Sequence, residues 1–284
     1  MGTPEAAVPP LRALVTAGHR IRLVVTQPDR RRGRGSELVA SPVKAAATEL
    51  GLPVSAKVND LIGAGVELAV VVAFGRIIRP HVLEAVPMVN LHFSLLPRWR
   101  GAAPVERAIL AGDQVTGVCL MALDEGLDTG PVYDCRAVDI GPEESADDLR
   151  RRLSALGAAM VVEALAGGVA GLGKPRPQQG EPTYAAKIDP AELRLDWSRP
   201  AEELHRVVRL GSAWTTVGGR RLRVLEARVA PEAGLPPGTL DSTVVGTGAG
   251  GLALVRVQPE GRGPMGGADW VRGARLGQGA VLGG

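Results

Sequence analysis

The sequence of 284 residues lacks the features of a disulfide scaffold, a zinc protein or a membrane protein. It has only two cysteines, Cys119 and Cys135, without C-x-x-C or other metal-like spacing. Both lie in or beside apolar runs, which predicts two buried, reduced thiols. No apolar run approaches the roughly 20 residues that cross a bilayer, and no basic region leads into an apolar stretch at the N-terminus. We therefore expect a cytoplasmic protein that does not bind a membrane.

Two further absences narrow the function. No G-x-G-x-x-G follows the first strand-like run, which argues against a nicotinamide-dependent oxidoreductase. No histidine has a second soft ligand nearby, so we expect no metal. Lysine is scarce, so arginine supplies most of the positive charge, and arginine is densest at residues 29–35 and 218–228. Such clusters suit phosphates and nucleic acid, although a solvated face is the commoner explanation of a run of charge and genomic composition bias is another.

The first half of the chain alternates strand-like with helix-like segments. Near-continuous valine, isoleucine and leucine in the strand-like runs predict an α/β domain with a Rossmann-like parallel sheet covered on both faces. The expected strands are residues 19–28, 66–74, 87–95 and 115–123, and the expected helices are residues 42–51, 101–113 and 146–168.

The second half of the chain has a different pattern of helix-like and strand-like segments. Residues 171–182 are rich in proline, glycine and glutamine, and after them one helix is followed by short strands with glycine-rich turns. This pattern predicts a small β-barrel of the oligonucleotide-binding (OB) type. We expect a catalytic domain at residues 1–173, a linker at residues 174–192 and an OB-like domain at residues 193–284.

Three polar side chains interrupt the apolar run at residues 89–104. In an extended strand, Asn90, His92 and Ser94 point to one face. A buried amide is costly without partners, so the pattern indicates a site as well as a core strand. Ligands of parallel sheets bind beyond the carboxyl ends of strands, and the strand at 115–123 is followed by a turn that carries Asp128. We therefore expect an amide, an imidazole and a carboxylate in one crevice.

These motifs resemble those of the folate-dependent formyltransferases, and most closely the branch that acts on methionyl-tRNA. The resemblance lies in "NLHFSLLPRWRGAAP" at residues 90–104 and "DEGLDTG" at residues 124–130. Shorter matches, "GTPE", "TQPDR", "GRG", "SPVK" and "LDW", extend it over essentially the whole chain.

The resemblance implies formyl transfer from 10-formyltetrahydrofolate, a co-substrate, to the α-amino group of initiator methionyl-tRNA. It implies catalytic roles for Asn90, His92 and Asp128. The folate would lie against Ser94, Leu95, Leu96 and Pro97, and against the loop that carries Phe74 and Gly75.

The resemblance also implies that tRNA binds both halves of the chain. Arg34 occupies the position of a loop residue that enters the acceptor arm, although an ordinary solvated loop is a competing interpretation. In the second half, Arg220, Arg221 and Arg223 follow a Gly-Gly turn and could track the tRNA backbone. We expect the protein to act as a monomer.

Two departures from the family pattern carry expectations of their own. Family members usually have an apolar strand before "GTPE", whereas this chain opens at Met1, so we expect a longer natural protein whose first strand lies in mid-sheet. The segment around Trp214 lacks the usual prolines, so we expect this side chain in the core.

Other functions remain open on the sequence alone. A formyltransferase that acts on an amino sugar nucleotide would share Asn90, His92, Asp128 and the use of folate. A glycinamide ribonucleotide formyltransferase is disfavoured by the second domain, and an inactive RNA-binding protein is disfavoured by the intact polar set. The basic segment at residues 29–35 favours tRNA.

Overall fold

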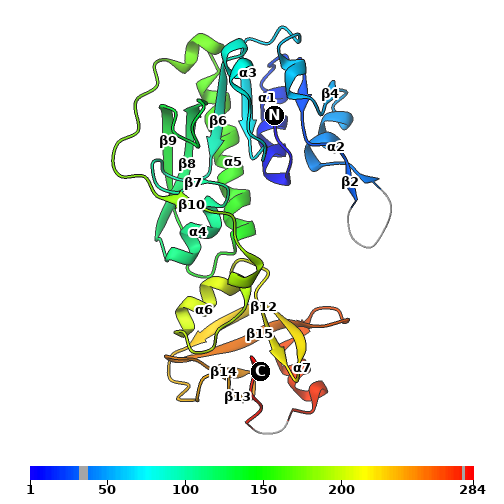
Figure 1. Cartoon of the computed structure of the whole chain (residues 1–284), viewed down its shortest axis with the longest axis vertical. Coiled ribbons are helices and arrows are strands. Elements are labelled where there is room, and N and C mark those ends of the chain that lie inside the picture. The colour runs from blue at the N-terminus through cyan, green and yellow to red at the C-terminus, as the bar shows by residue number, and fades with distance from the viewer. Residues whose placement is uncertain (32–37, 277–278) are drawn as a thin grey trace. The chain divides into compact units, whose positions relative to one another are not determined.

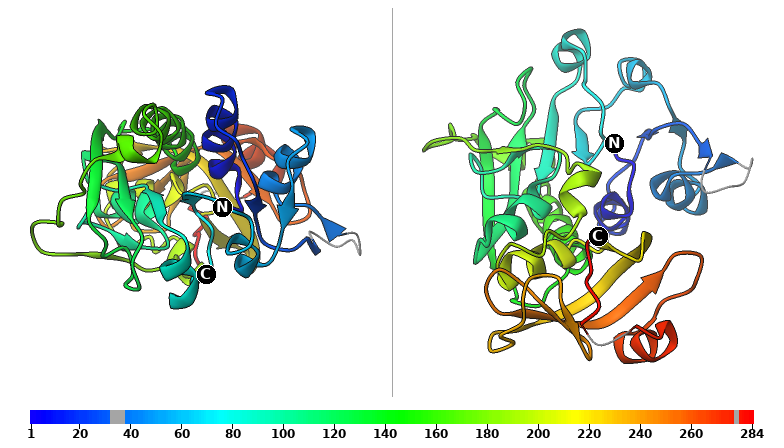
Figure 2. Two further views of the ribbon diagram at one scale, coloured as in Figure 1. Left: turned by 90° about the horizontal axis from the view of Figure 1, so that it is seen from above. Right: turned by 60° about the horizontal axis from the view of Figure 1, so that its bottom comes forward.

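The computed structural model describes residues 1–31, 38–276 and 279–284, and the chain forms two compact units (Figures 1 and 2). The first unit comprises residues 1–105, 115–139 and 149–186, and the second comprises residues 106–114, 140–148 and 187–284. The chain passes between the units more than once, so neither is one uninterrupted stretch of sequence.

The main sheet of the first unit is mixed. Its strands are, in order, β5 (Ala69–Val72), β6 (Met88–His92), β8 (Val115–Ala122) and β9 (Val132–Asp139). Strands β5 and β6 are parallel as predicted, but β8 runs antiparallel to both of its neighbours. The sequence analysis missed β9 because none of its side chains is buried and it lacks an apolar run. The prediction of a wholly parallel sheet is therefore wrong at β8 and β9.

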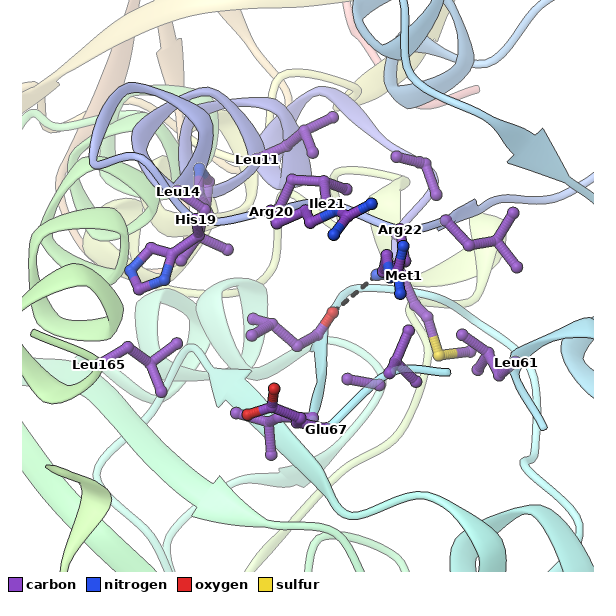
Figure 3. Close-up of a pocket in the computed structure, with 18 of the residues that line it drawn as sticks. Met1, Leu11, Leu14, His19, Arg20, Ile21, Arg22, Leu61, Glu67 and Leu165 are labelled. Atoms are coloured by element: carbon purple, nitrogen blue, oxygen red, sulfur yellow. Dashed lines mark hydrogen bonds between the residues drawn. The ribbon is translucent and has the colours of Figure 1, made fainter. Parts of the chain in front are cut away.

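Met1 and Gly2 join this sheet to a second, parallel pair of strands, β1 (Val24–Val25) and β4 (Val54–Ser55). The Met1 carbonyl accepts from Val72 N at 2.9 Å, and Gly2 N donates to the Val25 carbonyl at 3.1 Å. Beside Met1 lies a cavity of about 360 Å³, lined from both edges by residues 20–24 and 65–70 among others (Figure 3). Two residues thus link β1 to β5.

Helix α5 lies along one face of β6 and β8 (Figures 1 and 2). Gly157 allows this close packing, since a Cβ there would lie 3.2 Å from a methyl carbon of Leu91. The α-helices of the described residues are α1 (Val8–Thr16), α2 (Pro42–Glu49), α3 (Pro80–Ala85), α4 (Pro104–Ala111), α5 (Ala146–Ala164), α6 (Ala201–Val208) and α7 (Gly267–Ala274). The short 3-10 helices are η1 (Glu5–Ala7), η2 (Val58–Leu61), η3 (Val169–Leu172) and η4 (Pro190–Leu193).

Two short strand pairs complete the first unit. β2 (Arg30–Arg31) and β3 (Leu38–Val39) are antiparallel. β7 (Arg100–Gly101) pairs in parallel with β10 (Tyr184–Ala185), which ties the segment after β6 to a part of the chain more than 80 residues away.

The second unit is an open antiparallel sheet with helices α6 and α7. The strand order is β11 (Trp214–Val217), β12 (Arg220–Ala230), β15 (Gly251–Pro259), β14 (Val244–Gly246) and β13 (Leu240–Asp241), and β16 (Met265–Gly266) pairs with β15. Its core includes Trp197, Leu204 and Val224. Among the described residues no sheet closes into a barrel, so the expected OB-like closure is not confirmed.

The two cysteines differ from the prediction. Cys119 on β8 and Cys135 on β9 lie directly opposite each other and form a disulfide. Cys119 is buried, whereas Cys135 is exposed. The sequence could not show this pairing, because it depends on the hairpin between two strands of which one was not predicted.

In the described part of the chain, no helix has the length and apolar character needed to cross a membrane. The same residues contain no group of three or more histidine, cysteine, aspartate or glutamate side chains that could hold a metal ion.

Candidate active site

Strand β6 carries the amide and imidazole of the candidate site. The β-branched and apolar residues of this strand pack between β5 and β8, with Asn90 opposite Met121 and His92 opposite Cys119. The His92 side chain is buried, whereas Asn90 is partly exposed. Among the described residues the Asn90 amide has no hydrogen-bond partner.

Both ring nitrogens of His92 face oxygen atoms. His92 Nε2 donates to the carbonyl oxygen of Trp99 at 2.8 Å, because a carbonyl oxygen can only accept. On the other side of the ring, Nδ1 lies 3.5 Å from Oδ2 of Asp128. The carboxylate can therefore orient the imidazole and stabilise positive charge on it.

Asp128 reaches His92 from the loop between β8 and β9, residues 123–131. Its backbone has φ of +52°, in the left-handed region. The carboxylate oxygen Oδ2 accepts from the Gly101 amide at 2.8 Å. Asp124, and not Asp128, stabilises the turn in this loop. Its carboxylate accepts from Thr129 Oγ1 at 2.7 Å and from the Gly126 amide at 3.1 Å. Asp128 is thus directed away from its own turn and toward His92.

The route by which Asp128 arrives differs from the prediction. Because β8 is antiparallel to β6, it ends opposite Val89 and not beside the end that carries His92. The expectation that the carboxyl end of the strand at residues 115–123 lies beside that of the strand carrying His92 is therefore wrong. The loop returns far enough to place the carboxylate beside the imidazole all the same.

The segment expected to contact folate has both internal and accessible parts. The buried Ser94 hydroxyl donates to the Arg98 carbonyl at 2.5 Å, so it shapes the turn after β6. Leu95, Leu96 and Pro97 are partly exposed, and the bond between Leu96 and Pro97 is cis.

At the end of β5, the Phe74 ring belongs to the core. Its carbonyl accepts from Gln27 Nε2 at 3.0 Å and from Thr3 Oγ1 at 3.2 Å. Gly75 follows with φ of +71° and is exposed, so backbone and not the Phe74 ring is presented at this edge.

The arginines of the second unit lie on β12 after the turn at Gly218–Gly219. The Arg221 guanidinium lies 4.4 Å from the centre of the Trp214 ring. Arg223 donates to Gln258 Oε1 at 3.1 Å, and Arg220 is exposed. Trp214 is only half-buried and is not part of the core cluster, so its predicted core position is wrong. Arg34 lies outside the described residues.

The sequence analysis missed the residues that hold Asp128 in place, Gly101 and Gln178. Gln178 Nε2 donates to the carbonyl oxygens of Asp128 and Gly130, both at 2.8 Å. Its only sequence signal was a position in a segment rich in proline, glycine and glutamine, which was interpreted as a linker. None of Asn90, His92 and Asp128 lines the cavity of Figure 3, so that cavity is not the candidate active site.

Comparisons with known proteins identify the family of the chain. The family model described as Formyl transferase matches residues 1–165, and the model described as Formyl transferase, C-terminal domain, matches residues 187–275. The chain therefore belongs to the formyl transferase family.

Within the family, a curated methionyl-tRNA formyltransferase from Roseobacter denitrificans is 46% identical over 99% of this chain and 97% of its own length. One from Sorangium cellulosum is 46% identical over 99% of this chain and 98% of its own length. The solved N-formyltransferase from Helicobacter canadensis, in complex with folinic acid and dTDP-3-aminofucose, is 17% identical, with a TM-score of 0.69 over 91% of this chain and 97% of that one. The last likeness concerns the fold alone.

Proposed function

We propose that this chain is an enzyme that transfers the formyl group of 10-formyltetrahydrofolate to the α-amino group of initiator methionyl-tRNA, as the names of its curated relatives suggest. The observation that carries the proposal is the pairing of His92 with Asp128 next to the unpartnered amide of Asn90. The protein is proposed to act as a monomer.

Formyl transfer to an α-amino group does not require a strong catalytic base. Free α-amino groups have a pKa of about 8, so a useful fraction of the nucleophile is neutral at physiological pH. The amine nitrogen attacks the formyl carbon, and the carbonyl oxygen becomes an oxyanion. The bond to the folate nitrogen then breaks, and a proton passes from the amine to that nitrogen. The products are N-formylmethionyl-tRNA and tetrahydrofolate.

Each polar residue has a role in that sequence. Asn90 donates from its free amide to the oxyanion, a contact that can lower the barrier by about 3 to 4 kcal/mol. His92 shares this contact through its Nε2 hydrogen, or it accepts the amine proton at Nε2. Acceptance requires the tautomer with the ring hydrogen on Nδ1, directed toward Asp128, in which Nε2 has released the Trp99 carbonyl. Asp128 holds the ring and stabilises its charged form.

The folate and tRNA contacts form the second part of the proposal. The folate lies against the segment Ser94–Pro97, with Leu95, Leu96 and Pro97 at the accessible surface, and against the exposed backbone at Gly75 beside Phe74. The tRNA backbone lies against Arg34 and against Arg220, Arg221 and Arg223. Guanidinium groups suit phosphate oxygens, and their binding weakens as salt rises.

The direct test is transfer of radiolabelled formyl from 10-formyltetrahydrofolate to charged initiator tRNA. Asp128→Asn keeps the shape of the side chain but removes its charge, and we expect it to lower kcat by about 100-fold or more. Asp134→Asn, at an exposed carboxylate on β9, is the matched control and should retain the wild-type rate. An Asp128→Asn enzyme within about twofold of wild type would contradict the proposed role.

A parallel assay separates the alternative acceptor. The Helicobacter canadensis structure shows that this fold also occurs with an amino sugar nucleotide bound. Formyl transfer to an amino sugar nucleotide, with none to methionyl-tRNA, would replace the tRNA assignment by the sugar assignment. The 46% identity to curated methionyl-tRNA formyltransferases favours tRNA.

A further inference from the structure

We propose that Gln178 is a positioning residue that holds Asp128 against His92, and that Arg100 fixes the orientation of Gln178. The inference rests on the proposed function, because it assigns Gln178 an effect on formyl transfer through Asp128. Gln178 comes from a third segment of the chain and lies 50 residues after Asp128 in the sequence.

The Gln178 amide is fully engaged. Nε2 donates one hydrogen to the Asp128 carbonyl and the other to the Gly130 carbonyl, each at 2.8 Å. Oε1 accepts from Arg100 Nε at 3.1 Å and from Arg100 Nη2 at 2.6 Å. Since a flipped amide would place its oxygen against two carbonyls and its nitrogen against a guanidinium, this orientation is the only one that satisfies every group.

The hydrogen bonds from Gln178 are made to a turn in which Asp128 has a left-handed backbone conformation. Asp128 has φ of +52°, a backbone conformation that is unfavourable for most non-glycine residues. The two carbonyls that Gln178 binds flank Thr129, so the peptide planes on both sides of the turn are tied down. Without these bonds, the Asp128 backbone can relax and its carboxylate can move away from His92.

The same dipeptide holds both parts of Asp128. Arg100 orients the amide that binds the Asp128 backbone, and the neighbouring Gly101 amide donates to the Asp128 carboxylate at 2.8 Å. Gln178 is itself anchored close by, because the Arg176 amide donates to the Val132 carbonyl at 2.8 Å and the Arg176 carbonyl accepts from the Val132 amide at 2.7 Å. Gln178 is half-buried, whereas Gln179 is exposed and has no hydrogen bond among the described residues.

The test uses Gln178→Glu with Gln179→Glu as the matched control. The glutamate keeps the size of the side chain and its contact with Arg100, but it cannot donate to the two carbonyls. We expect kcat for formyl transfer to fall about 10- to 100-fold in Gln178→Glu, since a misplacement of about 1 Å can cost that much. The KM values for both substrates should stay within about threefold of wild type, and Gln179→Glu should match wild type.

A double-mutant cycle distinguishes positioning from a general structural effect. If Gln178 acts through Asp128, adding Gln178→Glu to Asp128→Asn should lower kcat by less than about twofold further. Independent, multiplicative losses would overturn the inference, as would a kcat of Gln178→Glu within about twofold of wild type. A lack of effect of Asp128→Asn alone would overturn both the role of Asp128 and the positioning role.

A second readout needs no turnover. The imidazole resonances of His92 can be assigned with a His92→Asn variant. We expect them to shift in both Gln178→Glu and Asp128→Asn and to be unchanged in Gln179→Glu. If the wild-type chain transfers formyl to neither acceptor, the proposed function fails, and this spectrum still decides whether Gln178 controls the surroundings of His92. Unchanged resonances in Gln178→Glu would overturn the inference.

Discussion

The α-ammonium group of Met1 makes the stability of the 284-residue chain depend on pH. The group is buried and donates to the Val70 carbonyl at 2.6 Å (Figure 3). Burial lowers its pKa from 8.0 to about 5, because desolvation disfavours the charged form. Between these two values the unfolded chain binds a proton that the folded chain does not bind. Stability therefore falls as the pH falls from about 8 to about 5.

The size of the effect follows from the two pKa values. A difference of about three pH units at about 1.4 kcal/mol per unit corresponds to about 4 kcal/mol. That is a large part of the roughly 5 to 15 kcal/mol by which domains are stable. The loss of stability should be nearly complete at pH 5, and it should be small above pH 8.

Urea unfolding between pH 5 and pH 8 measures this dependence. The comparison is between the chain with a free Met1 amine and the same chain acetylated at that nitrogen, with intact mass confirming that Met1 is present in both. The acetylated chain lacks the titrating group, and the cavity of about 360 Å³ beside Met1 can take the added group. We expect the free-amine form to lose about 4 kcal/mol more than the acetylated form. Equal pH dependence in the two forms would refute the reasoning.

Three further predictions concern single side chains. Gly101→Ala places a Cβ 2.8 Å from the Ala185 carbonyl oxygen at a position with φ of +122°. The kcat for formyl transfer should therefore fall at least about 10-fold, while folate binding measured by fluorescence stays unchanged. Normal turnover would contradict the close packing. Trp197→Phe leaves the buried Thr215 hydroxyl without its 3.0 Å partner and should destabilise the second unit by about 2 kcal/mol in calorimetry, with Thr215→Val added to the same variant restoring part of the loss. Arg221→Ala should reduce the slope of log affinity for tRNA against log salt by about 0.7 to 0.9, and an unchanged slope in filter binding would exclude a phosphate contact.

The part of the site on β6 could be predicted from the sequence because a strand has a simple period. Alternation places Asn90 and His92 on one face, and the structure has them on one strand with His92 beside Asp128. The direction of β8 could not be predicted, because β9 has no buried side chain to mark it as a strand. The contact between His92 and Asp128 was therefore expected for a reason that the sheet topology does not support.

Long-range contacts account for the other differences. Gln178 acts on a loop 50 residues away, and nothing in a segment rich in proline and glycine indicates that partner. Cys119 and Cys135 meet only because of a hairpin register. The prediction for Trp214 rested on missing prolines nearby, which carry no information about its contact with Arg221.

The link that Met1 and Gly2 make between β1 and β5 has a practical consequence for production of the protein. The Met1 amine donates to the Val70 carbonyl beside the cavity lined by residues 20–24 and 65–70, so a residue joined to that amine would start there. Gly2 leaves no room for compensation, since a Cβ there would lie 2.5 Å from that of Ala7. A purification tag attached directly to Met1 would therefore start inside the first unit.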